Sequence, residues 1–99
     1  MNAACLVVGD DNVANLSGEL DFSSVPGIWQ QLKSLVQLGK IDCLSLTGVE
    51  SSNSAALAML IEARALAESS RQSLQIVDLP RGLKDLAAMS NVLALIETT

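Results

Sequence analysis

Apolar and polar positions along the chain follow two different periods, and the changes of period mark its elements. Short apolar runs at residues 4–8 and 13–16 flank the turn-forming segment 9–12, which predicts a β-hairpin. Two further apolar runs, at residues 41–46 and 74–77, have the length and composition of largely buried strands. The pattern therefore predicts four strands.

Between these runs, apolar residues recur at spacings of three and four, which places them on one face of a helix. The first helix is expected to start near Pro26, with Ser23 or Ser24 accepting a hydrogen bond from a free amide of its first turn, and to stop at Gly39. Residues 55–67 give the strongest helical stripe in the chain. Its members are Ala56, Met59, Leu60, Ala63, Leu66 and Ala67.

A short third helix is expected after Pro80, followed by a last turn at residues 92–96. The order is then β-β-α-β-α-β-α. Strand, helix and strand in succession imply a right-handed crossover and a parallel pair. We therefore expect an α/β fold with a mixed, largely parallel four-stranded sheet packed by helices. At 99 residues and 49% apolar positions, residues 1–99 are predicted to form one domain.

Charge narrows the classes of partner. Six basic against eleven acidic residues give a net charge of −5, and the cations are scattered, which excludes a nucleic-acid or anionic-lipid surface. No Lys or Arg precedes the first apolar run, and no run is long enough for a membrane span, so we expect a cytoplasmic protein. Cys5 and Cys43 stand in apolar contexts and are predicted to be free, buried thiols.

The residues offer little for catalysis. The chain has no His and no Tyr, its carboxylates are dispersed, and it has no glycine-rich phosphate loop. We therefore predict no catalytic site, no cofactor and no metal. The local feature with chemical leverage is the Ser51, Ser52, Asn53, Ser54 run at the head of the long helix. One of these residues is expected to cap the helix, and a phosphate at this position would be stabilised.

The sequence resembles the STAS domain family (sulfate transporter and anti-sigma factor antagonist). The similarity rests on the element order, on residues 16–21 (LSGELD) and on residues 53–58 (NSAALA), and it extends from Val13 to about Leu86. Asn53 falls on the family's Asp and Ser54 on its Ser or Thr. Asn53 in place of the family's Asp removes a carboxylate beside the hydroxyl, which counts against a kinase switch that depends on that charge.

The resemblance implies a non-catalytic binding subunit. The short length, Gly18 to Asp21 followed by Pro26 and Trp29, and the helix around Leu57 resemble the branch that serves Mla-type phospholipid ABC transporters. It implies binding to the ATPase subunit, in complex with a permease, and thus an indirect, peripheral position at the inner membrane. Such a transporter maintains outer-membrane lipid asymmetry. The alternative within the family is an anti-sigma factor antagonist switched by phosphorylation of Ser54.

Ser52, Asn53, Ser54 and Trp29 are the candidate partner-binding residues. Trp29 lies about 100° around its helix from Ile28, on the flank of the apolar stripe. A Trp at such a position is either the edge of the core or an interface anchor, because Trp is enriched at interface hot spots. The sequence leaves both interpretations open.

Overall fold

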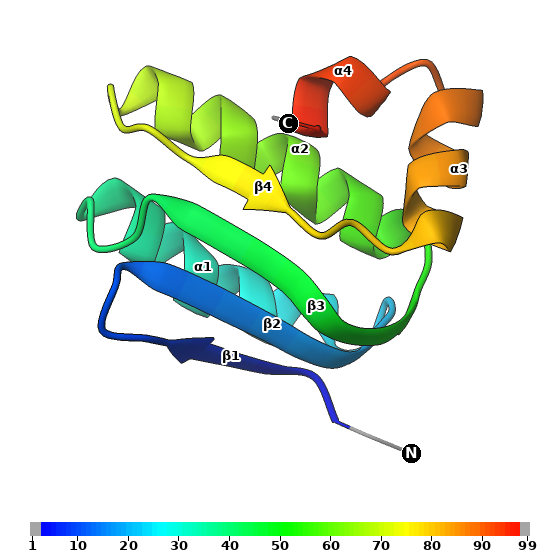
Figure 1. Cartoon of the computed structure of the whole chain (residues 1–99), viewed down its shortest axis with the longest axis horizontal. Helices are drawn as coiled ribbons and strands as arrows, with labels where there is room; N and C mark the ends of the chain where they lie inside the picture. The colour runs from blue at the N-terminus through cyan, green and yellow to red at the C-terminus, as the bar shows by residue number, and fades with distance from the viewer. Residues whose placement is uncertain (1–2, 98–99) are drawn as a thin grey trace.

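The computed structural model describes residues 3–97, which form a four-stranded sheet and four helices (Figure 1). The strands lie in the order β1-β2-β3-β4, with β1 antiparallel to β2 and the other pairs parallel. This confirms the predicted fold class. The elements are β1 (Cys5–Val8), β2 (Val13–Leu20), α1 (Val25–Gln37), β3 (Cys43–Ser52), α2 (Ser54–Ser69), β4 (Gln75–Val77), α3 (Arg81–Met89) and α4 (Leu93–Ile96).

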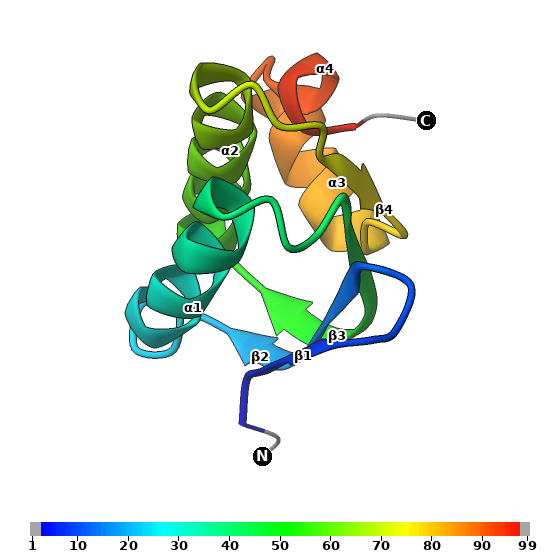
Figure 2. The same ribbon diagram turned by 90° about the vertical axis from the view of Figure 1, so that its left-hand side faces the viewer.

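The core lies between one face of the sheet and the helices. Helices α1 and α2 run along that face, and α3 and α4 pack against α2 (Figure 2). Ala14, Leu16 and Leu20 of β2 point into this core and are buried, whereas Asn15 and Ser17 between them are not. This alternation is expected where one face of a strand is covered and the other is open.

The central strands are longer than their apolar runs predict. The parallel pairing of β2 and β3 continues until Leu20 lies opposite Ser52, well beyond Leu16 and Leu46. Ser51 and Ser52, in the polar run expected at the head of the long helix, are therefore part of β3, because backbone pairing does not require apolar side chains. None of the helices within residues 3–97 is long and apolar enough to cross a membrane.

Gly18 sits where the register between β2 and β3 shifts. Its φ is +87°, in the left-handed region, and a Cβ there would lie 2.2 Å from the backbone oxygen of Ala3. Glycine is therefore required at this point of β2, three residues before the loop into α1 begins at Asp21.

The prediction of two buried thiols is wrong for Cys5, although both cysteines are free. Cys5 lies on the edge strand β1 and pairs with Ser17 of β2. It is exposed because both side chains lie on the face of the sheet that no helix covers. Cys43 is half-buried. Burial raises the pKa of the Cys43 thiol, and the carboxylates of Asp42, Asp78 and Asp11 raise it further.

Candidate functional site

Two strand-to-helix loops lie next to each other at the carboxyl edge of the sheet. Strand β2 ends at Leu20 and β3 ends at Ser52, and these two residues are paired. The loop of residues 21–24 leads into α1, and the single residue Asn53 leads into α2. Because the strands are parallel neighbours, the sheet brings the starts of both helices to one edge.

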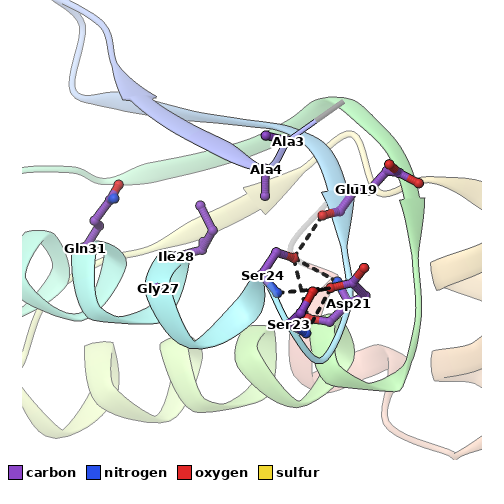
Figure 3. Close-up of a pocket in the computed structure, with 9 residues that line it drawn as sticks. All are labelled: Ala3, Ala4, Glu19, Asp21, Ser23, Ser24, Gly27, Ile28 and Gln31. Carbon is purple, nitrogen blue, oxygen red and sulfur yellow. Dashed lines mark hydrogen bonds between the residues drawn. The ribbon is translucent and has the colours of Figure 1, made fainter. Parts of the chain in front are cut away.

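The loop before α1 is closed by its own hydrogen bonds. The Asp21 Oδ1 atom accepts from the Ser23 amide at 2.9 Å, the Ser23 hydroxyl at 2.7 Å and the Ser24 amide at 3.0 Å (Figure 3). The Ser24 hydroxyl donates to the Glu19 carbonyl at 2.9 Å and accepts from the Asp21 amide at 3.0 Å. Every polar side chain of this loop is thus hydrogen-bonded within the loop or to the end of β2.

This geometry corrects the expected capping of the first helix. Ser24 occupies the N-cap position, but its hydroxyl faces the end of β2 and makes no capping bond, and Ser23 makes none either. The carboxylate of Asp21 takes the local amides instead, as Asp side chains do in Asx turns.

The same hydrogen bonds affect the ionisation of Asp21. Donation from the Ser23 hydroxyl, followed by the amides of Ser24 and Ser23, lowers the pKa of this carboxyl below its ordinary value of 3.8. Asp21 is therefore a structural carboxylate that stays ionised, and it is unsuited to act as a general acid near neutral pH.

The start of α2 is organised differently. Asn53 has an extended backbone, and its Oδ1 atom accepts from the Ala55 amide at 2.9 Å, so Asn53 is the N-cap. The expected cap in the polar run is thereby confirmed and assigned. Ser52 is half-buried at the end of β3.

Ser54 is the first helical residue of α2 and is exposed. Within residues 3–97 its hydroxyl makes no hydrogen bond. Since Asn53 supplies the cap, the hydroxyl of Ser54 is not needed to hold the helix and faces outward, available to another molecule.

An apolar groove runs between α1 and α2 beside this serine. Its volume is about 430 Å³. The α1 side provides Val25 and Trp29, with Phe22 at the mouth, and the α2 side provides Ala55 next to Ser54. The full lining is Phe22, Val25, Pro26, Trp29, Ala55, Ala58, Met59 and Glu62. We call this the α1–α2 groove.

The α1–α2 groove brings Trp29 close to the start of α2, next to Ser54, although the two residues are far apart in the sequence. Trp29 is half-buried: part of it packs on the core, and part lines the groove. Its place at the edge of the core is thereby confirmed, and its role as an interface anchor stays a prediction. Phe22 was missed by sequence analysis, although it is 72% exposed. Its position in a polar loop, outside any helical stripe, was the available signal.

A second hollow of about 510 Å³ lies on the other side of the α1 start (Figure 3). It extends from Ala3 and Ala4 past the Asp21 and Ser24 network to Gln31. Its most polar groups already bond one another. Among residues 3–97 no cluster of three or more His, Cys, Asp or Glu side chains is arranged to hold a metal ion.

The fold and the two loops can be compared with known proteins. A family model described as Mlab, STAS domain matches residues 7–97. The chain belongs to this STAS domain family. A search of curated proteins found no match.

Solved structures of STAS domains have the same fold. The anti-sigma factor antagonist SpoIIAA in its unphosphorylated form is similar with a TM-score of 0.68 and 12% identity, over 88% of this chain and 83% of that one. The Bacillus cell fate determinant SpoIIAA in its phosphorylated form gives a TM-score of 0.70 and 13% identity, over 98% and 92%. At these identities the likeness shows the fold alone, and the match to the family model confirms the family resemblance noted in the sequence.

Proposed function

We propose that this STAS domain is a non-catalytic accessory subunit, similar to MlaB, that binds and supports the ATPase of an Mla-type phospholipid ABC transporter. The ATPase subunit (MlaF-like) would be bound in complex with its permease, which places the domain at the inner membrane only through its partner. The observation that carries the proposal is the exposed Ser54 hydroxyl, unbonded within the described residues, beside an apolar groove. The Mlab description of the family supports this branch.

The chemistry of the surface supports binding rather than turnover. The sequence has no His and no Tyr, and the carboxylate of Asp21, in the neighbouring loop, is occupied by hydrogen bonds of that loop. At the start of α2, the exposed Ser54 hydroxyl can hydrogen-bond to a group of a partner, while Trp29 and Phe22 offer apolar contact area. Such a mixture of apolar core and polar rim is typical of protein interfaces.

Co-purification tests the proposal. Ser54→Glu introduces charge and bulk into the contact, and we expect it to weaken retention of the ATPase subunit by tenfold or more, a loss on the order of 1.4 kcal/mol. Its thermal stability should be unchanged or slightly higher, because a carboxylate near a helix N-terminus stabilises it by ~0.3–1 kcal/mol.

Ser54→Ala is the matched variant, and it should retain the partner better than Ser54→Glu does. Both variants are compared with wild type by pull-down of the ATPase and by thermal unfolding. A Ser54→Glu protein that folds and holds the ATPase as tightly as wild type would show that the site is assigned wrongly.

The second candidate is an anti-sigma factor antagonist switched by phosphorylation of Ser54. It is favoured by the exposure of the Ser54 hydroxyl at the first position of a 16-residue helix, where a dianion is electrostatically stabilised. Mass spectrometry of the protein isolated from its native cells tests it. Phosphate on Ser54, together with co-purification of a kinase instead of an ATPase, would favour this candidate over the first.

A further inference from the structure

The α1–α2 groove has an ordered chemical profile along its length. On α2, Ala55, Ala58 and Glu62 are spaced three and four residues apart and therefore form one stripe along the helix. The stripe begins beside Ser54 with the methyl groups of Ala55 and Ala58, which leave space above the helix, and it reaches the carboxylate of Glu62 one helical turn after Ala58. The groove is thus apolar over its first turn and acidic at its far end.

Glu62 is the one charged residue among those that line the groove. It is exposed, and within residues 3–97 it has no ion pair. An apolar ligand without a cation would cover this carboxylate partly and leave it unpaired, which costs free energy. The groove therefore fits a ligand that is apolar over the first turn and cationic at the far end.

We infer that the α1–α2 groove receives an amphipathic helix of the partner, with a large apolar side chain against Phe22, Trp29 and Ala58 and a Lys or Arg facing Glu62. Because Ala58 and Glu62 are one turn apart, about 6 Å along the helix axis, the apolar anchor and the cation are three or four residues apart in the partner. This inference rests on the proposed function, and it specifies the segment of the ATPase that docks.

Charge disfavours two other occupants. In a symmetric contact with a second copy, the groove would meet its own surface, where Glu62 faces Phe22 or another Glu62 and finds no cation. Two copies of net charge −5 also repel each other. An anionic lipid would bring its headgroup charge toward the same carboxylate.

Two substitutions with matched controls test the groove in the whole chain. Phe22→Ser removes the exposed aromatic ring of the groove. Leu38→Ser is its control, because it removes a similarly exposed apolar side chain, 67% accessible, at the other end of α1. Glu62→Lys reverses the groove charge, and Glu68→Lys makes the same change at an exposed position of α2 outside the groove.

Affinity is measured for the purified ATPase–permease complex. We expect Phe22→Ser to weaken binding by about tenfold or more and Glu62→Lys by about fivefold, with both controls within about twofold of wild type. Thermal unfolding verifies that all four variants are folded.

The segment itself is found with synthetic 20-residue peptides that cover the sequence of the ATPase, made with Phe in place of any Trp. Trp29 is the only Trp of the chain, so its fluorescence reports directly on the groove. A peptide with the anchor and cation three or four residues apart should shift the emission, and Glu62→Lys should abolish the shift.

The outcomes separate the two proposals. If wild type fails to bind the ATPase complex, the proposed function and this inference are both overturned. If wild type binds, Ser54→Glu does not, and Phe22→Ser and Glu62→Lys bind like their controls, only the groove assignment is overturned. A wild-type dimer in sedimentation equilibrium that Phe22→Ser dissociates, or an emission shift with anionic phospholipid vesicles but with no peptide, overturns it as well.

Discussion

The two helix starts at the carboxyl edge of the sheet are built from the same residue types but use them in opposite ways. Before α1, the carboxylate of Asp21 and the hydroxyls of Ser23 and Ser24 bond to groups of their own turn or of the strand end. Before α2, Asn53 alone provides the cap, and the neighbouring Ser54 hydroxyl is exposed.

The contrast shows that a serine at a helix start is available to a partner only when its hydroxyl is not already hydrogen-bonded within the fold. A hydroxyl that satisfies the backbone is occupied, and removing it costs stability. A hydroxyl next to an independent cap can be changed at little cost to the fold, and so it is free to serve a partner. The following predictions test which residues near the two helix starts are needed for stability and which are available to a partner.

The largest effect is expected at Gly18, in the strand that leads into the first helix start. Gly18→Ala places a Cβ against the Ala3 backbone and requires a left-handed conformation in β2, so we expect a loss of about 2 kcal/mol or more in unfolding free energy. Gly27→Ala is the matched control, because a Cβ at Gly27 of α1 meets nothing within 4 Å. Chemical denaturation should show the control at least as stable as wild type. Equal stability of the two variants would contradict the role of Gly18.

Ser24→Ala removes the hydroxyl that joins the first loop to the end of β2. The Glu19 carbonyl and the Asp21 amide each lose a partner, and we expect a loss of about 1–2 kcal/mol in unfolding free energy. The melting temperature should fall by several degrees. A Ser24→Ala protein as stable as Ser54→Ala would erase the distinction between the two starts.

At the second start, Asn53→Ala and Ser54→Ala should behave differently although they are adjacent. Loss of the Asn53 cap should cost about 1 kcal/mol, whereas Ser54→Ala should stay within about 0.5 kcal/mol of wild type. Thermal unfolding of the two proteins in the same buffer gives the comparison. A larger loss for Ser54→Ala would mean that its hydroxyl has a structural role.

The smallest effect concerns pH. The folded pKa of Asp21 lies below its ordinary value of 3.8, so the stabilisation from its ionised form is present above that value and is lost as pH falls through the folded pKa. The melting-temperature advantage of wild type over Asp21→Asn should therefore be constant near neutral pH and shrink below pH 3.8. Asp85→Asn controls for the loss of one negative charge. An advantage that grows on acidification would contradict the assignment.

Much of this arrangement was predictable, since the apolar runs give all four strands and the helical stripes give α1, α2 and α3. The pattern could not show how far β2 and β3 pair, because the last residues of β3 are polar and are held by backbone hydrogen bonds. Asn53 as a cap followed from its residue type and place. The absence of a side-chain cap on α1, where Asp21 instead closes the loop before the helix, could not be predicted, because it depends on how the chain leaves β2.

Side-chain exposure was harder to predict than the elements. Cys5 has apolar neighbours, yet the face of the sheet on which it lies has no covering helix, and the sequence of β1 does not say which face is covered. Phe22 gave no periodic signal because it lies in a loop, and the groove it borders forms only when α1 and α2 come together.

The strand order places both helix starts on the interior strands β2 and β3, whereas the short strands β1 and β4 form the edges. In native proteins, brief openings begin at edges and ends, and the amides at the centre of a sheet exchange with solvent only in rarer, larger openings. The surface around Ser54 is thus anchored to the part of the molecule that opens least. Fraying of either edge strand leaves the spacing between the two helix starts intact, so the partner proposed for this surface would meet a preformed surface, and association would carry little ordering cost.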